Sequence, residues 1–177
     1  AVATATDAIF RAHGAKARGE DRARSWERGR FHSPALRDTL LDAGVLAETL
    51  ETATTWSALP ELYARVSAAL TAALTAEGTP PVIMCHISHV YPAGASLYFT
   101  VVAALTEQPA SQWAAAKRAA SDAIAESGAT ITHHHAVGAD HRPWFADEIG
   151  DTGVRILRAI KAELDPTGIL NPGTLIP

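Results

Sequence analysis

The order of hydrophobic patterns in the middle of the chain restricts the fold more than any other feature. Alternating apolar and polar residues indicate strands, and apolar residues that recur every three or four positions indicate helices. By this criterion the predicted order is strand, helix, strand, strand, helix, strand, over Val45–Thr52, Ser57–Leu74, Val82–Tyr91, Ser96–Leu105, Ser111–Ser127 and Ala129–His133. The turn residues Pro92, Ala93 and Gly94 join the second and third strands as a hairpin.

This order predicts an α+β fold of the ferredoxin-like type, an antiparallel sheet of four strands with two helices on one face. The right-handed crossover rule leaves few other arrangements. Extra helices are expected toward the two ends of the chain. They are predicted over Val2–His13, from Pro34 with Ser33 as its N-cap and Gly44 at its end, and over Asp151–Leu164.

Composition indicates one globular domain. The chain has 177 residues, of which 47% are hydrophobic and 19% charged. The net charge of −4 gives no electrostatic reason to expect nucleic acid, and acidic residues interrupt the early basic residues, as on a solvated helix face. The single cysteine, Cys85, excludes an internal disulfide and suits a reducing compartment, so we expect a cytoplasmic protein.

The N-terminal residues predict a place within a longer protein. The chain starts without Met and begins at once with an amphipathic helical pattern that ends at Gly14. No secretory signal and no apolar run of membrane-spanning length is recognisable. We therefore expect the chain to begin part-way through a larger protein.

Three adjacent imidazoles, those of His133, His134 and His135, follow the last predicted strand. The run is internal, whereas expression tags lie at termini. Along an extended chain, alternation would send His133 and His135 to one face and His134 to the other. Neutral imidazole is the commonest general base and metal ligand, so we interpret the run as functional, with a solvated loop as the alternative.

Several motifs resemble those of a known superfamily. The tail K-A-E-L-D-P-T-G-I-L-N-P-G, Lys161 to Gly173, resembles the end of FAD-linked oxidases, whose flavin lies in a separate N-terminal domain. Within that superfamily, H-H-H-A-V-G resembles the alkylglycerone-phosphate synthases, also called alkyldihydroxyacetonephosphate synthases, whereas 2-hydroxy-acid dehydrogenases typically show E-H-G-V-G. The agreement extends to S-H-V-Y-P-A-G-A-S-L-Y-F, L-R-D and E-T-x-x-x-W, at 88–99, 36–38 and 51–56.

The resemblance implies FAD-dependent exchange of the acyl chain of acyl-dihydroxyacetone phosphate for a fatty alcohol, as in ether lipid synthesis. Tyr98 matches the catalytic tyrosine of the family and would act as general acid or base. His133, His134 and His135 match the triplet that lines the flavin and substrate site, with His134 and His135 as cofactor contacts. Without the resemblance, the alternative interpretation of Tyr98 is an aromatic core residue on a strand.

The resemblance also implies a phosphate ligand. We favour Arg30 over Arg28 in the segment R-G-R-F, because the planar guanidinium suits phosphate oxygens. The alternative for Arg30 is a solvated charge. Ala136 departs from the family, which usually has Gly at this place, and its Cβ would restrict close approach of the backbone to the cofactor.

A metal site is not implied. In the hydroxy-acid enzymes two His and one Glu hold a divalent metal, and His89 matches the first of them. The position of the second His is closest to Tyr98, and the position of the Glu is closest to His134. A phenol and an imidazole thus replace a preferred imidazole and carboxylate, so we expect no metal ligand in the chain.

We find no Gly-rich pyrophosphate loop and no flavin-binding domain. Residues 1–177 are therefore expected to be the C-terminal substrate (cap) domain of an alkylglycerone-phosphate-synthase-like flavoprotein, inactive alone, with FAD bound mainly by an N-terminal domain. The alternatives are the cap domain of a metal-assisted, FAD-dependent 2-hydroxy-acid dehydrogenase and a non-catalytic ferredoxin-like binding module. Expected partners are its own FAD domain and a small-molecule or lipid substrate, without nucleic acid; peripheral membrane association of the full protein and a homodimer stay open.

Overall fold

The structure, a computed structural model, describes residues 2–31 and 33–176. The chain divides into two compact units, Ala1–Thr39 and Leu40–Pro177. The first unit contains α1 (Val2–Ala12), α2 (Asp21–Gly29) and most of α3 (Ser33–Asp42). Within α1 and α2, all of whose residues are described, no residue is buried. The N-cap prediction for Ser33 concerns a side chain outside the described part, although α3 does begin at this residue.

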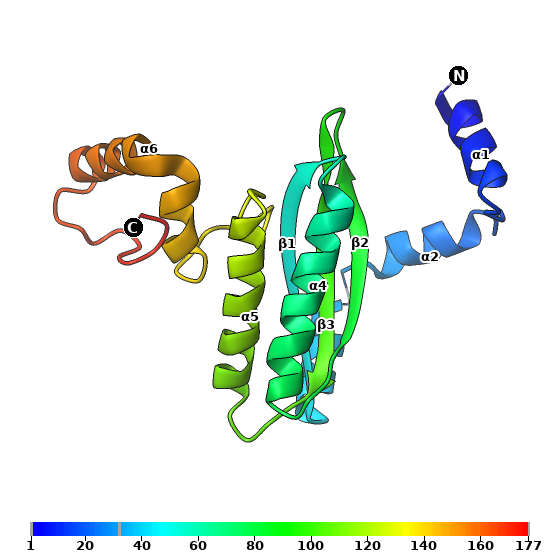
Figure 1. Cartoon of the computed structure of the whole chain (residues 1–177), viewed down its shortest axis with the longest axis horizontal. Helices are drawn as coiled ribbons and strands as arrows, with labels where there is room; N and C mark the ends of the chain where they lie inside the picture. The colour runs from blue at the N-terminus through cyan, green and yellow to red at the C-terminus, as the bar shows by residue number, and fades with distance from the viewer. Residues whose placement is uncertain (1, 32, 177) are drawn as a thin grey trace. The chain divides into compact units, whose positions relative to one another are not determined.

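The second unit is an α+β structure built on an antiparallel sheet. Its strands lie in the order β1-β3-β2, so the central strand β3 pairs with both neighbours. The helices α4 and α5 pack against each other and cover one face of the sheet (Figure 1). The elements are β1 (Val45–Thr55), α4 (Leu59–Ala76), β2 (Val82–Val90), β3 (Gly94–Ala104), α5 (Pro109–Glu126) and α6 (Arg142–Leu164). The predicted fold class is confirmed.

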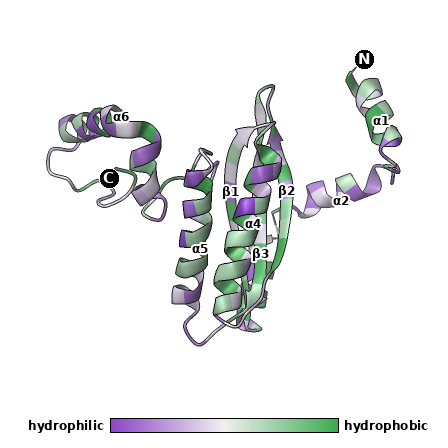
Figure 2. Ribbon diagram, viewed as in Figure 1, coloured by the Kyte–Doolittle hydropathy of each residue, from purple (hydrophilic) through white to green (hydrophobic). Residues whose placement is uncertain are grey.

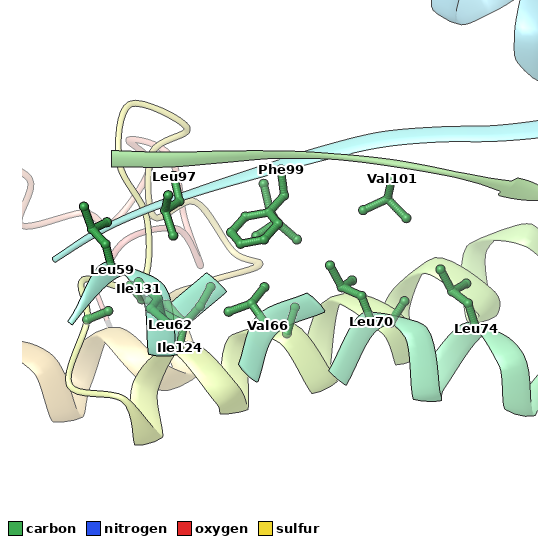
Figure 3. Close-up of a cluster of buried hydrophobic side chains, with 14 of the residues drawn as sticks. Leu59, Leu62, Val66, Leu70, Leu74, Leu97, Phe99, Val101, Ile124 and Ile131 are labelled. Atoms are coloured by element: carbon green, nitrogen blue, oxygen red, sulfur yellow. The ribbon is translucent and has the colours of Figure 1, made fainter. Parts of the chain in front are cut away.

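The hydrophobic core lies between the sheet and the two helices. On β3, Leu97, Phe99 and Val101 alternate toward the helices, as strand geometry requires. On α4 the buried residues recur every three or four positions and form one stripe that faces these strand residues (Figure 3). That stripe consists of Leu59, Leu62, Val66, Leu70 and Leu74. Burying each such side chain stabilises the fold by about 1.5–3 kcal/mol, so this layer fixes the sheet on the helices.

The hairpin between β2 and β3 depends on a glycine. Gly94 pairs with Thr55 of β1, and a Cβ built on Gly94 would lie 2.0 Å from the carbonyl oxygen of Thr54. Its own carbonyl accepts a 2.8 Å hydrogen bond from the N–H of Tyr91. Only glycine allows β3 to start this close to β1.

The fourth predicted strand, over 129–133, is present only as a short segment beside β1. Thr130 forms a single bridge with Ala53, and its N–H donates to the Ala53 carbonyl at 3.1 Å. The N–H of His133 donates to the Glu51 carbonyl at 3.0 Å. These hydrogen bonds are spaced two residues apart on β1 and three on the segment, so the register slips by one residue. A regular ladder therefore does not continue.

The C-terminal helix α6 starts earlier than predicted, at Arg142, and it contains a break. Gly150 has φ 67° and ψ 171°, which no helical residue adopts, so the predicted start at Asp151 marks the second part of α6. In the first part, Trp144 packs against the core and donates its ring N–H to Asp122 of α5 at 2.7 Å. Among the described residues, no helix has the length and apolar character needed to span a bilayer.

Candidate functional site

The face of the sheet opposite α4 and α5, here called the outer face, carries the polar residues. In the pairing of β1 with β3, Glu51 is opposite Tyr98, and in the pairing of β2 with β3, His86 is opposite Tyr98. Directly paired residues of antiparallel strands project from the same face. The adjacent pair, Leu50 and Phe99, is buried in the core. Glu51, His86 and Tyr98 therefore share the outer face.

Glu51 lies at the centre of this site, and its side chain is only 2% exposed. Its Oε1 accepts a 2.9 Å hydrogen bond from the hydroxyl of Ser96. Three imidazoles surround the carboxylate. The distances are 3.3 Å from Oε1 to His133 Nδ1, 3.5 Å from Oε1 to His89 Nδ1 and 4.0 Å from Oε2 to His135 Nε2.

The ionisation of Glu51 follows from these contacts. Burial acts to raise the pKa of Glu51, but the hydrogen bond from Ser96 and the close, charged imidazole of His133 outweigh it and hold the pKa below its usual value. The group is thus an anion at neutral pH. A buried anion surrounded by imidazoles can stabilise positive charge that develops on any of them.

An irregularity in β2 brings His89 to the site. The register of β2 with β3 shifts between Ile87 and Val90, as in a β-bulge. The N–H of His89 then donates to the Ser96 hydroxyl at 3.0 Å, and His89 Nδ1 lies 3.0 Å from the Ser88 hydroxyl. Strict alternation after His86 would have placed His89 on the core face. The bulge is therefore what adds this imidazole to the outer face.

The three consecutive histidines do not alternate as an extended chain would. His134 has φ 61° and Ala136 has φ 63°. A left-handed conformation costs a non-glycine residue about 1–2 kcal/mol and often marks a functional site. Because of this turn, the ring of His134 stacks on that of His133, with centroids 4.0 Å apart, and lies 4.3 Å from the ring of His89. The prediction that His134 faces the opposite side is wrong.

Two tyrosines approach the imidazoles. The ring of Tyr98 meets that of His135 edge-on, with centroids 5.4 Å apart. The hydroxyl of Tyr91 lies 3.1 Å from His133 Nε2, within hydrogen-bond distance. The structure therefore brings together Tyr98 and the three predicted histidines, and it adds Tyr91 and Glu51, which the sequence did not single out.

Arg30 belongs to the first unit. Its guanidinium lies over the ring of Phe31 at 4.9 Å and over that of Trp26 at 5.7 Å, measured to the ring centroids. Such stacking limits the freedom of an arginine without consuming its N–H donors. Its role as a phosphate ligand stays a prediction.

One group of side chains among the described residues could hold a metal ion: Glu51, His89, His133 and His134, whose ligand atoms lie within 4.8 Å of one another. The sequence implied no metal because its motif lacked a carboxylate, but β1 supplies one in Glu51. Two nitrogens that bind one zinc ion at about 2.1 Å are at most about 4.2 Å apart. The ligand atoms of the group spread over up to 4.8 Å, so a pair at that separation would have to approach before both could bind one ion.

Comparison with known proteins assigns the chain to a family. The sequence profile of FAD linked oxidases, C-terminal domain, matches residues 1–175. The chain belongs to this family. It is 32% identical over 155 residues to the alkyldihydroxyacetonephosphate synthase of Dictyostelium discoideum, a match that covers 87% of the chain and 25% of that relative. For the Caenorhabditis elegans alkyldihydroxyacetonephosphate synthase the identity is 35% over 145 residues, covering 80% and 24%.

A solved structure of an alkyldihydroxyacetonephosphate synthase superimposes on the chain with a TM-score of 0.65 and 25% identity, covering 97% of this chain and 28% of the other. The predicted resemblance to the synthases of the FAD-linked oxidase superfamily is therefore confirmed. The chain spans about a quarter of the length of the synthases it matches.

The family implies FAD in the full-length proteins, and the outer face fits one part of that cofactor. His134 and His135 are exposed, and with the phenol of Tyr98 they offer N–H and O–H donors and ring nitrogen acceptors. Such groups match the polar edge of a flavin ring. The predicted flavin contacts, His134 and His135, are thus accessible on this face, and their role in binding FAD stays a prediction.

Proposed function

We propose that the chain is the substrate-side (cap) domain of an FAD-dependent enzyme of the alkylglycerone-phosphate-synthase type. One observation carries the proposal: Tyr98 and the imidazoles of His133, His134 and His135 gather on one face of the sheet around the Glu51 carboxylate. The family match and the similar synthases support it.

The reaction exchanges an acyl for an alkyl chain on dihydroxyacetone phosphate. The bond between the substrate carbon and the acyl oxygen breaks, and the acyl chain leaves as a carboxylate. The alcohol oxygen forms the new ether bond to the same carbon, and the alcohol proton is released. When bound, FAD supplies a ring that can take up and return electrons within one turnover, so the exchange has no net redox change.

The residues of this chain handle the protons. Tyr98 acts as general acid or base, since a phenol on the outer face can take or give a proton at its hydroxyl oxygen. His135, whose ring centroid lies 5.4 Å from that of Tyr98, would receive or return that proton once its nitrogen and the phenol come within hydrogen-bond distance. Glu51 stabilises the imidazolium that results, because its Oε2 lies 4.0 Å from His135 Nε2. Arg30 would bind the substrate phosphate through its guanidinium.

The exposed surface of β2 supports a missing partner domain. Four apolar side chains of this edge strand are 47–68% exposed: Val82, Met84, Ile87 and Val90. Figure 2 shows β2 as largely hydrophobic. By their pairing with β3, Val82 and Met84 lie on the outer face and Ile87 and Val90 on the opposite face. Exposed apolar side chains on the face that carries the site commonly mark an interface. The FAD domain of the same protein would cover it, and the isolated chain would be inactive and free of FAD.

The direct test is a chimera in which this chain replaces the matching segment of the Dictyostelium discoideum synthase. We expect the purified chimera to bind FAD and to incorporate labelled fatty alcohol into ether product. A folded, FAD-containing chimera without exchange activity would overturn the proposal. An absorbance scan of the isolated chain should show no flavin bands, and stoichiometric flavin there would contradict its role as one wall of the site.

A second candidate is the metal-assisted dehydrogenase of 2-hydroxy acids, favoured by the four possible metal ligands around Glu51. It predicts that the chain binds one zinc ion and that His89→Ala abolishes the binding. Calorimetric titration with zinc chloride separates the two functions, because the exchange reaction requires no metal.

A further inference from the structure

We propose that Glu51 is a positioning residue that fixes His133 as the tautomer with its hydrogen on Nδ1, and that Tyr91 donates to the free Nε2. The three side chains then form a continuous chain of carboxylate, imidazole and phenol. Tyr91 becomes a second proton-bearing phenol of the site, besides Tyr98. Its catalytic use rests on the proposed function, whereas the arrangement itself does not.

Glu51 is held too firmly to be an incidental surface carboxylate. Its side chain is 2% exposed, and its Oε1 accepts the Ser96 hydroxyl at 2.9 Å. Its main-chain carbonyl accepts the N–H of His133 at 3.0 Å. Glu51 therefore contacts His133 through both backbone and side chain, which sets the distance between carboxylate and imidazole.

The surroundings of His133 select one tautomer. Its Nδ1 is buried, and no group within the described residues makes a well-aligned hydrogen bond to it. The Glu51 carboxylate, 3.3 Å away, is the acceptor in reach. An ionised carboxylate can only accept a hydrogen bond. Nδ1 can therefore form a hydrogen bond to Glu51 only if Nδ1 carries the hydrogen. In the neutral ring Nε2 then has a free lone pair and accepts from the Tyr91 hydroxyl, 3.1 Å away.

The same contact works in both directions. When His133 gains a proton, Nε2 becomes a donor and the Tyr91 oxygen accepts. Tyr91 can thus give its own hydroxyl proton to His133 Nε2 while its oxygen receives a proton from an alcohol, and the Glu51 anion stabilises the charge on His133. The hydrogen-bonded order resembles that of hydrolase triads, in which a buried carboxylate holds an imidazole beside a hydroxyl.

Tyr91 is built into the hairpin yet open to a ligand. Its N–H donates to Gly94, and its carbonyl accepts the ring N–H of Trp56 at 3.1 Å. The residue is 45% exposed, whereas the His133 side chain is only 15% exposed. Tyr91 also lines a hollow of about 340 Å³ whose other walls are mostly small residues, including Ala53, Ala95 and Gly128. Tyr91 is among the residues that line this hollow, and His133 is not.

Nuclear magnetic resonance of the ¹⁵N-histidine-labelled chain tests the arrangement at about pH 8, where an ordinary imidazole is neutral. Ring nitrogen shifts distinguish the two tautomers, and the spectrum of His133→Gln assigns the signals. We expect the Nδ1–H tautomer for His133. In Tyr91→Phe the Nε2 resonance should move, whereas in Tyr98→Phe it should stay.

Two substitutions at Glu51 separate its acceptor oxygen from general packing. Glu51→Met fills a similar volume without an acceptor, so the Nε2–H tautomer should appear. Glu51→Gln retains an oxygen that Ser96 can hold in place, so the Nδ1–H tautomer should persist. Circular dichroism verifies that both variants fold.

The proposal is overturned if wild-type His133 is the Nε2–H tautomer, if Glu51→Met keeps the wild-type tautomer, or if Tyr91→Phe leaves Nε2 unmoved. If neither Glu51 variant folds, the wild-type tautomer and Tyr91→Phe decide alone. These spectra need neither FAD nor substrate. If the spectra contradict the arrangement of Glu51, His133 and Tyr91, the exchange reaction is still decided by the chimera assay. If the chimera shows no exchange, the arrangement of these three residues still stands.

Discussion

Glu51 and Tyr98 lie directly opposite each other on β1 and β3. The next pair along, Leu50 and Phe99, is in the hydrophobic core. A slip of one residue between these strands would turn the carboxylate toward the helices and Leu50 toward solvent. Burial of the core residues on one face therefore also fixes which polar residues meet on the other. The site and the core depend on the same strand pairing.

The core layer can be tested at Leu70, which is fully buried on α4. Leu70→Ala should lower the free energy of unfolding by about 2–5 kcal/mol, because it removes buried methyl groups and leaves a cavity. Urea unfolding followed by circular dichroism measures this change. Leu164→Ala, at a residue that is 74% exposed, is the matched control and should have little effect. Equal losses in both variants would contradict the described packing.

Gly94→Ala should weaken the hairpin, because the new Cβ would meet the Thr54 carbonyl carbon and oxygen, which are backbone atoms and cannot turn aside. Overpacking of this kind costs about 1–3 kcal/mol. The displaced hairpin should also move Tyr91 away from His133. Gly29→Ala is a suitable control, since a Cβ at Gly29 meets no atom within 4 Å. Unfolding midpoints that fall equally in both variants would speak against a special role of Gly94.

Glu51 should make stability depend on pH. The pKa of Glu51 is lower in the folded chain than in the unfolded chain. The ionised carboxylate therefore stabilises the fold at pH values above its pKa in the unfolded chain. This stabilisation is lost as the pH falls through its pKa in the folded chain. We expect the stability difference between the wild type and Glu51→Gln to shrink as the pH falls below the unfolded pKa of glutamate, about 4.3. The comparison cancels the titrating groups that do not contact Glu51, whereas the imidazoles beside it are stabilised by the carboxylate when they carry a charge. A difference that does not shrink below that pH would show that the carboxylate is not stabilised as described.

Cys85 should react slowly in the folded chain. The thiol is half-buried, and burial raises its pKa to about 11. Because the thiolate is the nucleophile, alkylation by iodoacetamide at about pH 8 should be much slower in the folded chain than in urea. The rate in the folded chain should rise steadily toward the raised pKa. Fast alkylation at neutral pH would show that the thiol is open to solvent.

Periodicity alone predicted the element types well, because strong alternation and helical spacing depend only on local sequence. It failed where contacts between residues distant in sequence determine the extent of an element. The slipped hydrogen bonds of Thr130 and His133 reduced the expected fourth strand, and the break at Gly150 divided α6. The histidine triplet was interpreted as functional from the residues alone, whereas Tyr98 was found only through its resemblance to a family.

The sequence did not single out Glu51 and Tyr91, for a physical reason. A glutamate in a strand is ordinarily solvated, and only the pairing with β3 together with the segment after α5 buries Glu51. Tyr91 contacts His133 across 42 residues of sequence, a separation that local patterns cannot reveal. One available signal was the alternation of side chains along the strand, which places Glu51 on the face opposite Leu46 and Leu50. This alternation shows that Glu51 does not face the core, but it does not reveal which residues contact Glu51.

The role of the outer face is tested most directly by incorporation of labelled fatty alcohol by the chimera that carries this chain. We compare Tyr98→Phe with Tyr63→Phe, in which the same hydroxyl is removed from a tyrosine that stacks on Phe99 from α4. Loss of a general acid or base typically lowers a rate by about 10²–10⁴-fold. Tyr98→Phe should therefore lower exchange by at least about 100-fold, with FAD content unchanged and Tyr63→Phe fully active. Exchange at the wild-type rate in Tyr98→Phe would contradict the proposed role of this face.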